Sequence, residues 1–144
     1  MALKFGHHLA LARALGQLLG QRARVCKGSG ALVTAVPLAF ERQAERGFNQ
    51  ALEVARAAAA RLRLPLASDL LVRVRHAPPQ EGLTRQQRQR NVRGAFAVHR
   101  SCRGLHVLVV DDVMTSGATL AEVARTLKAA GAARVTNLVV ARTP

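Results

Sequence analysis

Short apolar runs alternate with helical repeats along the whole chain, and this alternation is the strongest constraint on its fold. Four runs are expected to be strands because they are rich in Val and Leu and bounded by turn residues: 31–36, 70–74, 107–110 and 135–141. Apolar residues at helical spacing predict helices over 9–19, 48–62 and 120–130. Strands and helices in this order predict an α/β fold, doubly wound, with a mainly parallel sheet and helices on both faces.

The length and composition predict a single domain over residues 1–144. A chain of 144 residues, 49% of them hydrophobic, can bury one ordinary core. No apolar run approaches the ~20 residues of a membrane helix, so no membrane is expected as a partner. The two cysteines, Cys26 and Cys102, lie far apart, which fits a reducing compartment. We therefore expect a cytoplasmic protein.

The charge of the chain points to an anionic partner. A formal net charge of +14 favours binding to a nucleic acid or to a phosphorylated metabolite. Proteins that bind single strands usually stack bases on aromatic rings, and this chain has no Trp or Tyr and only four Phe. Only weak, nonspecific binding to nucleic acid is expected.

The stretch VLVVDDVMTSGATL, residues 107–120, carries the most specific chemistry. Asp111 and Asp112 follow the predicted strand, and a loop of small and hydroxyl residues precedes the next helix: Thr115, Ser116, Gly117, Ala118 and Thr119. Hydroxyls and backbone N–H groups at a helix N-terminus suit a phosphate dianion, and carboxylates accept hydrogen bonds from sugar hydroxyls. The pattern indicates a ribose 5-phosphate site. The alternative is that the two acids only cap the strand and the helix.

Two other site types share part of this pattern, and the sequence excludes both. Receiver domains also end a strand in paired acids, but they need a phosphorylatable Asp on another strand and a later Lys, and no Asp follows Asp112. A nucleotide P-loop needs G-x-x-x-x-G-K-[ST], which is absent.

In parallel sheets, ligands bind beyond the carboxyl ends of the strands. The segments that leave the predicted strands, 37–49, 75–94 and 111–119, together with Arg142, are therefore expected to share one edge. The arginine-dense segment 77–94 has almost no apolar residue, so we expect it to lie outside the core, with 77–92 as the most mobile internal part. Thr84 and Gln87 have the spacing of a capping box, which predicts a short helical turn there.

The stretch VLVVDDVMTSGATL resembles, without gaps, the phosphoribosyl pyrophosphate (PRPP) motif of the type I phosphoribosyltransferases. VPLAFERQAERGFNQA and QEGLTRQQRQRNVRGAF resemble the ComF-type competence branch of that superfamily, and the similarity runs from about Leu3 to the end. Two features depart from the branch. Ala35 replaces a usual proline, and the four-cysteine zinc segment has no counterpart in this sequence.

The resemblance implies a role for each candidate residue. Asp111 and Asp112 would hold the ribose hydroxyls, and residues 115–119 would bind the 5-phosphate. Pyrophosphate would meet side chains that follow the first strand: Arg42, Arg46 and Asn49. Arginines of the later polar segment, Arg85, Arg88 and Arg90, would close as a lid. For all these arginines, a solvated surface role stays open. Mg²⁺ would be held mainly through the pyrophosphate and the ribose hydroxyls.

Two functions follow from the resemblance. The first is Mg²⁺-dependent transfer of ribose 5-phosphate from PRPP to an unknown nitrogenous acceptor, with release of pyrophosphate. The alternative is a non-catalytic accessory protein that senses PRPP or serves DNA uptake. A homodimer is left open.

Overall fold

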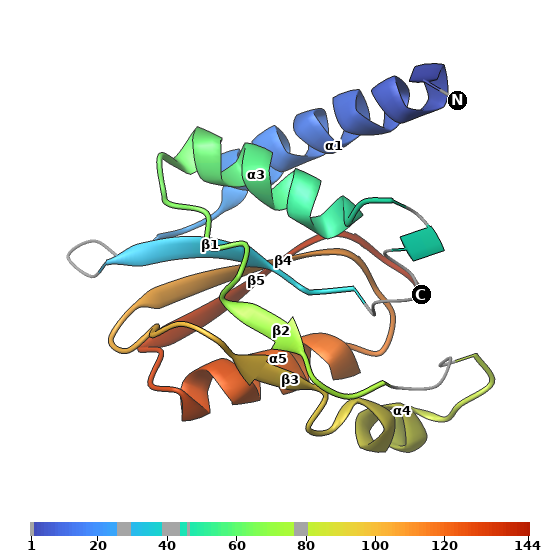
Figure 1. Ribbon diagram of the computed structural model, residues 1–144, viewed down its shortest axis with the longest axis vertical. Helices are drawn as coiled ribbons and strands as arrows, with labels where there is room; N and C mark the ends of the chain where they lie inside the picture. Colours follow the sequence, from blue (N-terminus) through green and yellow to red (C-terminus); the bar gives the residue numbers. More distant parts are fainter. Residues whose placement is uncertain (1, 26–29, 39–43, 46, 77–80) are drawn as a thin grey trace.

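The computed structural model describes residues 2–25, 30–38, 44–45, 47–76 and 81–144, with the backbone only for residues 2–5. In chain order the elements are α1 (Ala2–Arg22), β1 (Ala31–Ala35), α3 (Gln50–Leu62), β2 (Leu71–Arg73), α4 (Arg85–Val92), β3 (Phe96–Val98), β4 (His106–Met114), α5 (Ala118–Ala129) and β5 (Arg134–Arg142) (Figure 1). Within these described residues, no helix is long and apolar enough to cross a membrane.

Three strands form the central sheet in the order β1-β4-β5, and both pairings are parallel. Residue pairing between β1 and β4 runs from Ala31 and His106 to Ala35 and Val110. This confirms the predicted parallel sheet, and the predicted helices are all present.

The strand at β2 does not join the parallel sheet, so that part of the prediction is wrong. β2 pairs antiparallel with β3, a strand that was not predicted, in a separate two-stranded sheet. The free edge of β1 is already used by the segment that follows α3: Val33 donates to the Pro65 carbonyl, and its own carbonyl accepts from Ala67. The alternation of Phe96 and Val98 was the available signal for β3.

Helices cover both faces of the central sheet. In Figure 1, α1 and α3 lie on one side of the sheet and α5 lies on the other. The strand β4 contributes to both sides because its side chains alternate: Leu108 and Val110 pack in the cluster that contains α3, whereas Val107 and Val109 pack with α5 and with the β2–β3 sheet. β4 is therefore the buried centre of the fold.

The polar segment before β3 is better anchored than the sequence suggests. The predicted capping box is confirmed: the Thr84 side chain accepts from the Gln87 N–H, and the Gln87 side chain accepts from the Thr84 N–H. The helix continues for eight residues, and Val92 at its end is 1% exposed. The expectation that this segment makes no core contact is therefore wrong for Val92. Residues 77–80 lie outside the described part of the chain.

Candidate functional site

The acid pair lies inside β4, at the point where β4 extends beyond β1. The pairing with β1 ends at Val110, whose carbonyl accepts from the Val36 N–H. β4 was expected to end there, but it continues to Met114 because β5 still pairs with it, placing Asp111 opposite Val139. Beyond Val110, β4 therefore pairs with β5 on one edge and no longer pairs with β1 on the other. Asp111 and Asp112 stand at this opening.

Each carboxylate of the pair accepts a backbone N–H from the residue that follows it. The Asp111 Oδ1 lies 2.9 Å from the Asp112 nitrogen, and the Asp112 Oδ1 lies 2.8 Å from the Val113 nitrogen. Partial burial, followed by the neighbouring charge of Asp112, raises the pKa of Asp111 from 3.8 to about 7. The ion pairs found among the described residues involve other acids. The like charges of the pair are therefore relieved by proton uptake at Asp111 rather than by an ion pair with a described basic residue.

The loop after β4 has the conformation expected of an anion site. Gly117 has φ +81°, a region that favours glycine, and it is the N-cap of α5. It has no side chain to cap the helix, although the Ser116 hydroxyl accepts from the Ala118 N–H at 3.4 Å. A small cavity of about 30 Å³ is lined by both Asp111 and this loop, including Thr115 and Thr119. The structure therefore brings an acid and the phosphate-loop candidates together.

Asn49 lies at the same edge of the sheet, as predicted, because it follows β1. Its side-chain NH₂ donates to the Val36 carbonyl at 3.1 Å, and its oxygen accepts from the Leu52 N–H at 3.3 Å. These bonds make Asn49 the N-cap of α3. The other two predicted pyrophosphate ligands, Arg42 and Arg46, lie outside the described residues.

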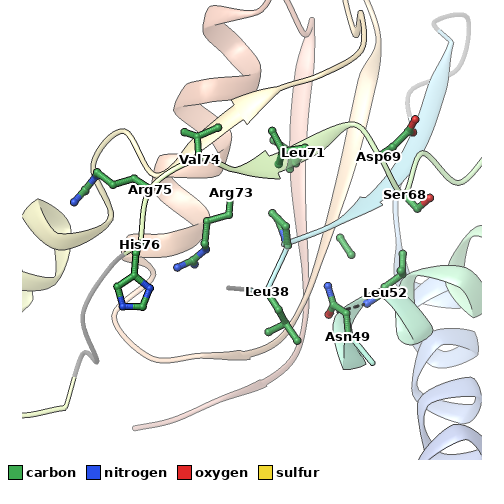
Figure 2. Close-up of a pocket in the computed structure, with 13 residues that line it drawn as sticks. Leu38, Asn49, Leu52, Ser68, Asp69, Leu71, Arg73, Val74, Arg75 and His76 are labelled. Carbon is green, nitrogen blue, oxygen red and sulfur yellow. Dashed lines mark hydrogen bonds between the residues drawn. The ribbon is translucent and has the colours of Figure 1, made fainter. Parts of the chain in front are cut away.

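A cleft of about 430 Å³ separates the end of β1 and the start of α3 from β2. Asn49, Arg73 and His76 are among its lining residues. Figure 2 shows Arg73 and His76 directed to the side where Leu38 lies, whereas Arg75 points away from it. The Arg73 guanidinium also lies 5.0 Å from the centre of the Phe96 ring. These two basic residues were not predicted; the basic string RVRH at the end of a strand was the available signal.

The arginines proposed as a lid lie on or beside α4, which packs on α5. Arg85 and Arg90 are exposed. Arg88 is partly buried, and its Nε has no hydrogen-bond partner within the described part of the chain. Arg75 links the strand region after β2 to the end of α4, because its guanidinium donates to the carbonyls of Asn91, at 2.8 Å, and of Arg93. Arg85, Arg88 and Arg90 therefore lie on a helix that packs on α5.

The donor atoms at the acid pair fit a magnesium ion held jointly with a substrate. Mg²⁺ prefers carboxylate oxygens, and it usually binds one or two of them together with phosphate oxygens and water. No group of three or more potential metal ligands exists in the described ranges, so these residues alone do not make a complete cage. Mg²⁺ would therefore be held mainly through the pyrophosphate and the ribose hydroxyls of the substrate, with Asp111 and Asp112 as the nearby carboxylates.

Sequence comparison finds bacterial relatives that are named DNA utilization protein and competence protein. The DNA utilization protein YhgH of Salmonella typhi is 37% identical over 138 residues, which are 92% of this chain and 61% of that protein. Competence protein F of Haemophilus influenzae is 32% identical over 136 residues, 89% of this chain and 59% of that protein. The chain therefore spans about three fifths of the length of these curated relatives.

Two solved structures of enzymes illustrate the shared fold. The glutamine PRPP amidotransferase of B. subtilis matches with a TM-score of 0.58 and 18% identity over 92% of this chain and 26% of that one. Hypoxanthine phosphoribosyltransferase of Trypanosoma cruzi matches with a TM-score of 0.53 and 16% identity over 94% of this chain and 79% of that one. The family model of the phosphoribosyl transferase domain matches residues 49–144. The chain therefore belongs to the phosphoribosyl transferase domain family, and the names of its relatives are consistent with the ComF-type competence branch.

Proposed function

We propose that this protein is a Mg²⁺-dependent phosphoribosyltransferase that transfers ribose 5-phosphate from PRPP to a nitrogenous acceptor. The observation that carries the proposal is the shared cavity of Asp111 and the loop 115–119. One side offers the Asp111 carboxylate for a ribose hydroxyl, and the other offers the N-terminus of α5 for the 5-phosphate. The family match supports the same ligand.

The charges around the site suit the bond changes of this reaction. The anomeric C–O bond to pyrophosphate breaks, a C–N bond to the acceptor forms, and the acceptor nitrogen loses a proton. Positive charge develops on the ribose, as in other glycosyl transfers, and the nearby carboxylates would stabilise it. When bound, Mg²⁺ would neutralise charge on the departing pyrophosphate.

Basic side chains on the β1–β2 side of the opening are suited to the departing group. Arg73 and His76 line the cleft that also reaches Pro37 and Asn49. Arginine pairs well with phosphate oxygens because its planar fork presents two parallel N–H donors. We assign the pyrophosphate end of PRPP to this cleft, together with Arg42 and Arg46 of the segment after β1 and with the lid candidates Arg85 and Arg88.

Isothermal titration calorimetry with PRPP, with and without Mg²⁺, tests the proposal on the unmodified chain. We expect binding that strengthens when Mg²⁺ is present. Asp112→Asn should weaken PRPP binding by about tenfold or more, because a charged hydrogen-bond acceptor is lost. Glu53→Gln is the matched control, since Glu53 is paired with Arg56 on α3 and does not line the cavity or the cleft.

The calorimetric result has a clear contrary outcome. If the parent chain fails to bind PRPP at millimolar concentration in the presence of Mg²⁺, the proposed substrate is wrong. A different result is that the chain binds PRPP and releases no pyrophosphate with any of the nitrogenous bases supplied. That result would favour a protein that senses PRPP over one that transfers ribose 5-phosphate.

A second function, binding to nucleic acid, is favoured by one observation on the opposite edge of the sheet. Seven exposed basic residues lie at the ends of α1, α3 and α5 and at the starts of β4 and β5, and we call them the basic edge: Arg22, Arg24, Arg61, Arg63, Arg103, Lys128 and Arg134. No acidic residue occurs in the segments that form it, 21–25, 61–64, 102–106 and 128–134. The names of the relatives, DNA utilization protein and competence protein, fit such a surface.

A further inference from the structure

Glu122 is a buried acid for which the proposed reaction has no use. It lies on α5, four residues after Ala118, and is 8% exposed. In the described ranges it is the only acidic residue classed as buried. Burial of a carboxylate is costly unless its oxygens are paired, so its partners identify its role.

One partner of Glu122 is local and the other is distant. Arg125, on the next turn of the same helix, donates to both carboxylate oxygens at 2.6 to 3.2 Å and is the main cause of the lowered pKa of Glu122. The distant partner is the backbone N–H of Gly94, 2.9 Å from the Glu122 Oε1. This bond joins residues 28 positions apart. It ties α5 to the segment that carries α4.

Gly94 is the C-terminal root of residues 81–94, which we call the arginine arm. Its φ is +70°, so the chain turns sharply there before the buried Ala95. Arg75 holds the same root from the other side through the carbonyls of Asn91 and Arg93. Two charged side chains thus fix the end of α4. The Glu122 carboxylate accepts from the Gly94 N–H, and the Arg75 guanidinium donates to the carbonyls of Asn91 and Arg93.

The helix that holds the arm also carries the phosphate loop. Gly117 is the N-cap of α5, and Glu122 is one turn further along the same helix. A helix is rigid over so short a distance, so the phosphate loop and the root of the arm keep a set spacing. Beside the bond between Glu122 and Gly94, the described contacts at the end of α4 include the packing of Val92 and the hydrogen bonds of Arg75.

From this arrangement we infer that Glu122 is a positioning residue, which holds the arginine arm against the phosphate-loop helix so that the arm's arginines meet the pyrophosphate part of PRPP. The inference rests on the proposed function for its ligand. Glu122 does not line the cavity shared by Asp111 and the loop 115–119, so it acts through Gly94 and touches no reacting atom.

The test compares Glu122→Ala and Glu122→Gln with the matched control Glu53→Gln, which disrupts an acid–arginine pair of the same i,i+3 spacing on α3. Hydrogen exchange and trypsin cleavage at Arg85, Arg88 and Arg90 report on the arm without any ligand. We expect both to speed up by about five- to twentyfold in Glu122→Ala and less in Glu122→Gln, which keeps an acceptor for the Gly94 N–H. The control should leave the arm unchanged.

Calorimetry on the same variants separates positioning from general damage. PRPP binding should weaken by about five- to twentyfold, whereas ribose 5-phosphate binding should stay within about twofold, since that ligand lacks pyrophosphate. Equal losses for both ligands, or an arm that exchanges as slowly as in the parent, would overturn the inference. If the parent binds no PRPP, the proposed function fails, and the exchange data still decide whether Glu122 anchors the arm. Where Glu122→Ala does not fold, Glu122→Gln decides both measurements.

Discussion

Asn49 donates its side-chain amide to the backbone carbonyl of Val36, 3.1 Å away, while it accepts the N–H of Leu52. Asn49, which was expected to bind pyrophosphate, thus links the end of β1 to the start of α3 by hydrogen bonds. Asn49→Ala should lower the free energy of unfolding by about 1 to 2 kcal/mol, since it removes a helix N-cap. Asn49→Asp keeps the cap acceptor but loses the donor to the Val36 carbonyl, so it should also lower the free energy of unfolding, by about 1 kcal/mol. Urea unfolding measures both.

The control for Asn49 is Asn137→Ala, because Asn137 is exposed on β5. A stability equal to that of the parent for Asn49→Ala, together with a large loss of PRPP binding, would show that Asn49 is a ligand and that its cap bonds contribute nothing.

Removing the charge of Asp111 should stabilise the ligand-free protein and weaken PRPP binding. Its pKa is raised from 3.8 to about 7, so the folded state binds more protons than the unfolded state between these values. The stability due to protonated Asp111 is present below about pH 4 and is lost as the pH rises through 7. At pH 8, Asp111→Asn should therefore raise the free energy of unfolding by about 1 to 2 kcal/mol.

Thermal unfolding of the parent and of Asp111→Asn between pH 5 and 8 checks this difference. Comparison at each pH is needed because burial lowers the pKa of His106, which destabilises the fold as the pH falls below 6.5 in both proteins. A variant that is less stable than the parent at pH 8 would mean that the Asp111 carboxylate serves the fold rather than the ligand.

The phosphate loop and the acid pair should be separable by ligand. Replacing Thr115 and Thr119 by Ala should weaken both PRPP and ribose 5-phosphate, by about 1.5 to 3 kcal/mol for each hydroxyl, because both ligands carry the 5-phosphate. Asp112→Asn should leave the binding of inorganic phosphate intact or tighten it, since a nearby like charge is deleted. Calorimetry with the three ligands measures this.

Thr126→Ala is the matched control for the two threonines, because Thr126 is on α5 but donates only to the Glu122 carbonyl in the described contacts. If Asp111→Asn and Asp112→Asn both bind PRPP with Mg²⁺ as tightly as the parent, the acids are structural caps.

Binding to nucleic acid should be weak, independent of base sequence and steeply dependent on salt, because neutralised phosphates release counterions. Changing Arg24, Arg61 and Arg63 to Gln should reduce the slope of log K against log salt by roughly 0.7 to 0.9 for each lost phosphate contact. The control changes Arg85, Arg88 and Arg90 to Gln, which removes the same amount of charge from α4. Fluorescence anisotropy with labelled oligonucleotides measures the slopes.

A larger loss from the arm variant than from the basic-edge variant would place the nucleic acid at the PRPP edge instead. Tight binding that survives physiological salt would favour the accessory function over transfer.

Local patterns in the sequence were enough to predict the three main helices, the parallel core strands and the capping box at Thr84. Each depends on residues within a few positions of one another, where backbone geometry fixes which side chains meet. The acid pair and the loop 115–119 were predictable for the same reason, since nine consecutive residues carry both.

Contacts between distant segments were decided only by the tertiary structure. β2 pairs with β3 because residues 65–67 already occupy the edge of β1, and no local pattern records which segment takes that edge. β4 extends beyond the end of β1 because β5 continues to pair with it. The bond from Gly94 to Glu122 depends on how α4 packs on α5, because hydrogen-bond partners 28 residues apart are chosen by packing and not by sequence spacing.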